Sequence, residues 1–131
     1  MASPRVLLAD DHRRVADAVG EYVAEAFQLV GTVGDGGALL EAAKTLQPDV
    51  IVADLSMPGT DGLTAMKQVR RQLPHLLVIL LTNHDDPVLV RHALDAGASC
   101  FVLKVHAPSE LVVAIRTVVD GGTFISSAIA M

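Results

Sequence analysis

Four short apolar segments of this chain each end on a residue that can contact a phosphate group or a metal ion. The segments are 5–9, 50–53, 76–81 and 101–103. The residues that follow them are Asp10 and Asp11, Asp54, Thr82 and Lys104. Apolar runs of this length are typical of buried strands. If the strands are parallel, their carboxyl ends meet at one edge of a sheet, where ligand sites of open α/β sheets lie.

Helical patterns alternate with these segments along the chain. They cover about 11–27, 39–46, 63–73, 90–97 and 108–119, with one more strand at about 29–33. Five alternating units of this kind predict an α/β fold with a parallel sheet that helices cover on both faces. Because crossovers between parallel strands are right-handed, the sheet is expected to be doubly wound.

Composition narrows the class of protein. The 131 residues suit one domain, and 51% of them are hydrophobic, which is enough for a large core. The formal net charge of −5 argues against a free-standing nucleic-acid binder, which would normally be basic. Cys100 stands alone, so no internal disulfide can form. Neither a signal segment nor a membrane-spanning run is evident, so we expect a cytoplasmic protein without membrane contact.

The converging strand ends predict phosphoryl chemistry with a metal ion. Two like charges about 4 Å apart repel by roughly 4 kcal/mol at an effective dielectric constant of 20, so clustered carboxylates need a counter-charge. Oxygen ligands with few protein donors suit Mg²⁺. We therefore expect Asp10 and Asp11 near the metal and Asp54 as the nucleophile that accepts a phosphoryl group. Lys104 and Thr82 would contact its equatorial oxygens.

Each of these residues also has a simpler interpretation. Asp11 could cap the first helix, Asp54 and Thr82 could cap a turn or helix, and Lys104 could be a solvated strand end. Taken one by one, these interpretations are adequate. It would be a coincidence, however, if four such residues stood at the ends of four strands for unrelated structural reasons. The shared position therefore favours the functional interpretation.

Longer motifs carry a resemblance to a known family. Asp10-Asp11-His12, the segment 54–62, Leu81-Thr82 and the segment 97–104 resemble the receiver domain of bacterial two-component response regulators. The Asp-Asp-His triplet, the segment 97–104 and the ending 121–126 are similar to the NarL/FixJ (LuxR-type) branch.

The resemblance implies a flavodoxin-like (βα)5 sandwich with strand order 2-1-3-4-5. It implies phosphotransfer from a sensor histidine kinase to Asp54 by a domain that is not a classical enzyme but assists its own phosphorylation and dephosphorylation. It adds the backbone carbonyl of Ser56 to the Mg²⁺ ligands Asp11 and Asp54, with Asp10 acting through water. It also makes Phe101 the aromatic switch residue that responds to Thr82.

The same resemblance implies a domain organisation. Residues 1–122 would form the receiver domain, and 123–131 would begin a linker to a helix-turn-helix DNA-binding domain that is not in this chain. Contact with DNA would occur only through that domain. From the apolar ending we expect a homodimer after phosphorylation.

One departure from the family pattern concerns the peptide bond after Lys104. Many receiver domains have proline there in the cis form, whereas this chain has Val105. Because a cis bond before a residue other than proline costs about 2.5–4 kcal/mol, we predict a trans bond.

Other α/β proteins fit the residues less well. A flavodoxin needs a phosphate loop after its first strand, where this chain places acidic residues. The segment 34–39 lacks the third glycine of a dinucleotide-binding loop, and neither a Walker loop nor zinc-like histidine spacing is found. A stand-alone phosphorelay receiver, the receiver of an output enzyme, and a scaffold that takes no phosphate remain alternatives to a transcription factor.

Overall fold

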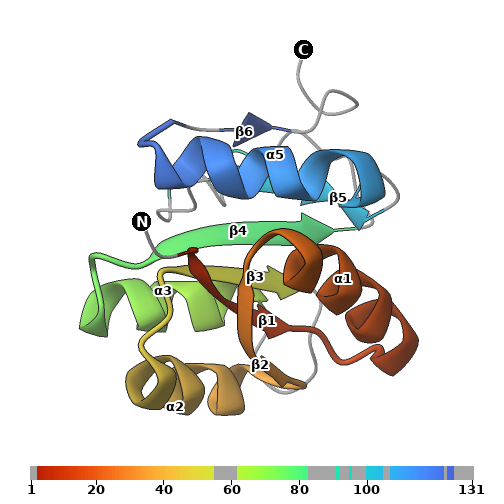
Figure 1. Cartoon of the computed structure of the whole chain (residues 1–131). Helices are drawn as coiled ribbons and strands as arrows, with labels where there is room; N and C mark the ends of the chain where they lie inside the picture. Colours follow the sequence, from red (N-terminus) through yellow and green to blue (C-terminus); the bar gives the residue numbers. More distant parts are fainter. Residues whose placement is uncertain are drawn as a thin grey trace.

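A computed structural model shows the chain as a parallel sheet with helices on both faces (Figure 1). It describes residues 3–54, 62–82, 91, 95, 100–104, 107–122 and 124–125. The strands are β1 (Arg5–Ala9), β2 (Gln28–Val33), β3 (Val50–Asp54), β4 (Leu77–Thr82), β5 (Cys100–Leu103) and β6 (Phe124–Ile125). The helices are α1 (Arg13–Ala26), α2 (Gly36–Leu46), α3 (Gly62–Gln72) and α5 (Ala107–Val119).

The strand order is β2-β1-β3-β4-β5-β6, and all pairs are parallel. This confirms the predicted flavodoxin-like order 2-1-3-4-5. The short strand β6 is an addition, because it lies in the segment 123–131 that we predicted as a linker and pairs with the outer edge of β5.

The two faces of the sheet carry separate hydrophobic clusters. On β1, Leu7 and Ala9 pack on the side of α2 and α3, whereas Val6 and Leu8 pack on the side of α1 and α5. The same alternation holds for β3, β4 and β5. Because successive residues of a strand point to opposite faces, a strand covered on both sides needs an unbroken apolar run. This is the physical reason for the runs seen in the sequence.

Two predictions about the fold fall largely outside the described residues. Of the predicted helix at 90–97, only Arg91 and Asp95 are described, and both are helical. The peptide bond between Lys104 and Val105 is not described, so its trans form stays a prediction. Within the described segments, no helix has both the length and the apolar character that crossing a membrane requires.

Gly31 of β2 lies in close contact with α2. A Cβ atom built on Gly31 would lie 2.9 Å from Cδ1 of Leu46 and 3.4 Å from Cδ1 of Leu7. A Cβ on Gly34, three residues later, would meet nothing within 4 Å. The missing side chain at position 31 therefore allows α2 to pack closely on the sheet.

We predict that Gly31→Ala lowers the free energy of unfolding by about 1 kcal/mol, because the end of the half-buried Leu46 side chain must move away from the added methyl group. Gly34→Ala is the matched control and should change it by less than about 0.5 kcal/mol. Urea unfolding followed by circular dichroism measures both. Equal effects of the two substitutions would contradict the packing argument.

Candidate functional site

The register of the sheet brings the predicted residues together. Ala9 pairs with Ala53, so Asp10 and Asp54 leave adjacent strands at the same level. On the other side of β3, Asp54 pairs with Leu81, next to Thr82. Thr82 in turn pairs with Leu103, the residue before Lys104. The carboxyl ends of β1, β3, β4 and β5 therefore lie together at one edge of the sheet, as the sequence predicts.

Lys104 is the counter-charge of two buried carboxylates. Its Nζ atom donates a hydrogen bond of 2.9 Å to Oδ2 of Asp54 and lies 3.5 Å from Oδ2 of Asp10. The side chains of Asp10 and Asp54 are 0% and 1% exposed, and that of Lys104 is 10% exposed. Low exposure strengthens these interactions, because water screens them little. The simpler interpretation of Lys104 as a solvated strand end is thereby wrong.

Asp10 is held by the backbone but remains partly unsatisfied. Its Oδ1 atom accepts a hydrogen bond of 2.9 Å from the backbone N–H of His12. Its Oδ2 atom is buried and accepts no hydrogen bond from any residue that the structure describes. Burial raises the pKa of the Asp10 carboxyl, and the charge of Asp54 acts in the same direction. The hydrogen bond from His12 and the charge of Lys104 lower that pKa in part.

Asp11 and His12 form the open side of the site. The side chain of Asp11 is 27% exposed and that of His12 is 59% exposed. Each of Asp10, Asp11, His12 and Asp54 offers one possible ligand atom, and these atoms lie within 4.8 Å of one another. Carboxylate oxygens, among them the unsatisfied Oδ2 of Asp10, are suitable ligands for a hard divalent cation. The residues present therefore fit Mg²⁺.

Sequence reasoning missed His12 as a member of this cluster. His12 is the N-cap residue of α1, but its side chain makes no capping hydrogen bond and lies near the carboxylates instead. Its position directly after Asp10-Asp11 was the available signal. Asp11 is not the cap that its simpler interpretation suggested, because His12 takes that position.

Thr82 and Phe101 lie on the neighbouring strands β4 and β5, two residues apart in register. Both are fully buried. Phe101 pairs with Leu80, two residues before Thr82, and belongs to the cluster on the side of α2 and α3. Strand alternation places Thr82 on that same face. Ser56, the remaining predicted metal ligand, lies outside the described residues.

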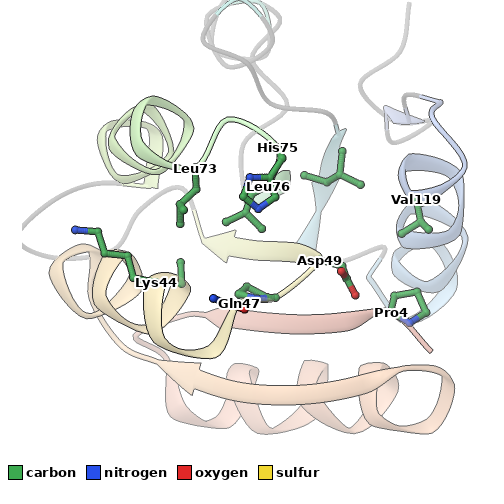
Figure 2. A pocket seen from close by; sticks show the side chains of 11 residues that line it. Pro4, Lys44, Gln47, Asp49, Leu73, His75, Leu76 and Val119 are labelled. Carbon is green, nitrogen blue, oxygen red and sulfur yellow. The ribbon is translucent and has the colours of Figure 1, made fainter. Parts of the chain in front are cut away.

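A cavity of about 650 Å³ lies at the opposite end of the sheet (Figure 2). Its wall includes Pro4, Asp49 and Leu76, which precede β1, β3 and β4. None of the acidic cluster residues lines it. We therefore place the candidate site at the carboxyl ends of the strands rather than in this cavity.

The raised pKa of Asp10 predicts an effect on stability. The stability that Asp10 contributes is fully present below its ordinary pKa and is lost as the pH rises through the raised value in the folded state. In metal-free buffer at pH 7, Asp10→Asn should therefore raise the free energy of unfolding by about 0.5–2 kcal/mol. Urea unfolding with EDTA measures this. The advantage should shrink at acidic pH, and exposed Asp17→Asn is the control. A less stable Asp10→Asn at pH 7 would refute the argument.

Comparison with known proteins agrees with this geometry. Residues 6–116 match the response regulator receiver domain family. The transcriptional regulatory protein MctR of Rhizobium johnstonii is 35% identical over 128 residues, which cover 95% of this chain and 59% of MctR. The chain spans less than two thirds of the length of curated relatives such as MctR.

Solved structures of response regulators resemble this chain over most of its length. A two-component response regulator of the LuxR family from Aurantimonas has a TM-score of 0.93 at 28% identity, with 98% of this chain and 93% of that chain covered. The signal receiver domain of NarL from Mycobacterium tuberculosis has a TM-score of 0.85 at 34% identity, with coverage of 92% and 99%. The relatives are mostly NarL/LuxR-type regulators. The chain therefore belongs to the response regulator receiver domain family.

Proposed function

We propose that this domain is a phosphorylation-dependent switch in which Asp54 accepts a phosphoryl group from a sensor histidine kinase. The observation that supports this best is the buried Asp54 carboxylate, bonded to Lys104 at 2.9 Å and adjacent to Asp10. A purely structural ion pair would not need a second buried carboxylate beside it. A scaffold that takes no phosphate has no use for this arrangement.

The proposed transfer follows from the chemistry of the residues. A carboxylate oxygen of Asp54 attacks phosphorus, the bond from phosphorus to the kinase histidine nitrogen breaks, and the imidazole keeps that electron pair. Lys104 and Thr82 stabilise the equatorial oxygens. Asp11, Asp54 and the Ser56 carbonyl would hold Mg²⁺, with Asp10 acting through water. The bound ion supplies positive charge that offsets the charge of the phosphoryl oxygens.

The proposed switch links Thr82 to Phe101. Moving an equilibrium from 1:99 to 99:1 takes about 5.5 kcal/mol of differential binding. Hydrogen bonds to a charged group contribute about 1.5–3 kcal/mol each, so contacts from Thr82 and Lys104 supply most of this. We propose that Thr82 moves toward the phosphoryl group and Phe101 follows into the space it leaves. The two side chains share one face of neighbouring strands, which supports this coupling.

The output that we propose is transcription. MctR is described as a transcriptional regulatory protein, and the relatives are longer than this chain. Residues 1–122 would be the receiver and 123–131 the start of a linker to a helix-turn-helix domain that contacts DNA. Response regulators act in the cytoplasm, and we propose that compartment here. A stand-alone phosphorelay receiver and the receiver of an output enzyme are the alternatives.

Incubation with acetyl phosphate and Mg²⁺ tests the acceptor. Intact mass should increase by one phosphoryl group in the parent chain and in the exposed control Asp17→Asn. Asp54→Asn should not gain it, because an amide is a poor nucleophile. EDTA should prevent labelling of the parent chain. Equal labelling of Asp54→Asn would refute the assignment of the acceptor.

We propose that the phosphorylated domain forms a homodimer, and light scattering can therefore report on the switch. A related structure is described as two RcsB dimers bound to DNA. We expect the phosphorylated parent chain to dimerise. Thr82→Ala should be labelled but should dimerise about 10–100-fold more weakly, because one hydrogen bond to a charged group is lost. Thr82→Ser keeps the hydroxyl and should behave like the parent. Equal dimerisation of all three chains would contradict the coupling.

A further inference from the structure

His12 is directed at the acidic cluster rather than at its own helix. It occupies the N-cap of α1 without a side-chain capping bond, and its backbone N–H donates to Asp10. Its ring atom Nδ1 lies 3.1 Å from Oδ1 of Asp11, 3.5 Å from Oδ1 of Asp10 and 3.8 Å from Oδ2 of Asp54. One imidazole nitrogen therefore lies close to all three carboxylates.

These separations match those between ligands of a single cation. With bonds of about 2.1 Å, adjacent ligands lie roughly 3.0 Å apart in an octahedron and 3.4 Å apart in a tetrahedron, and opposite ligands lie roughly 4.2 Å apart. The distances from Nδ1 of His12, 3.1 to 3.8 Å, fall inside this range. Little movement is needed for this nitrogen to share an ion with the carboxylates.

A second observation points to a ligand in the same place. The Asp10 side chain is completely buried, and the only positive charge that the described residues bring near its Oδ2 atom is Nζ of Lys104, 3.5 Å away and without a well-formed hydrogen bond. Lys104 is shared between Asp10 and Asp54, so a bound cation would add the second positive charge that this buried carboxylate lacks. The exposed side chains of Asp11 and His12 leave the cluster open to ions from solution.

We propose that Nδ1 of His12 is a metal ligand and that it makes this pocket prefer borderline first-row ions such as Ni²⁺ over Mg²⁺. Mg²⁺ favours oxygen ligands, whereas imidazole suits the borderline ions. The inference rests on the proposed function only for the location of the cation pocket. It adds a nitrogen donor, and with it a selectivity that oxygen ligands alone do not provide.

Pulsed electron paramagnetic resonance with Mn²⁺ alone tests this directly, because nitrogen bound to the ion gives a ¹⁴N modulation that oxygen does not. We expect the modulation in the parent chain and its loss in His12→Gln. His75→Gln is the matched control, since His75 lines the cavity at the far end of the sheet, and it should keep the modulation. By titration, His12→Gln should weaken Ni²⁺ binding about tenfold and Mg²⁺ binding less than about twofold.

Two results would overturn the proposal: no ¹⁴N modulation in the folded parent chain with Mn²⁺ bound, or modulation that persists in His12→Gln. Either would mean that carboxylates bind the ion without this nitrogen and that His12 only pairs with them. Circular dichroism confirms that His12→Gln is folded. Mass labelling in Mg²⁺ separates the two proposals: modulation without labelling of Asp54 refutes the phosphoacceptor alone, whereas labelling without modulation refutes the histidine ligand alone.

Discussion

The interaction on which the site depends is the attraction between one lysine and two buried carboxylates. Asp10 and Asp54 leave neighbouring strands side by side and would repel each other in a medium of low dielectric constant. Lys104 offsets this repulsion by its bond to Asp54 and its proximity to Asp10. One positive charge does not neutralise two negative ones, and Asp11 adds a third. The pocket therefore retains excess negative charge, which suits a divalent cation.

The excess negative charge of the pocket lowers the stability of the folded domain, and we attribute its presence to function. A fold selected for stability alone would not place an unsatisfied carboxylate oxygen at the end of β1. The domain stays folded despite this buried charge, because apolar residues cover both faces of β1, β3, β4 and β5. Hydrophobic burial on this scale outweighs the cost of one buried charged cluster at its edge. The rigid sheet also keeps the carboxylates in position before any ligand binds.

The sequence was sufficient to predict most of the fold and of the site. Apolar runs and helical periodicity located five strands, and their last residues supplied Asp10, Asp54, Thr82 and Lys104. Two features were missed. The pairing of β6 with β5 was not predicted, because two residues carry no periodicity. The orientation of His12 was not predicted either, because a ring at a helix N-cap has several low-energy directions and its neighbours in space select one.

The sequence by itself determined which residues end the strands, since this information is local: a run of apolar residues stops where a polar one begins. It also determined that both faces of the sheet would be covered. The register between strands, the burial of Asp10 and the approach of the His12 ring to three carboxylates arose only in the folded molecule. Those features depend on how helices from distant parts of the chain pack against the sheet, and local patterns do not encode that packing.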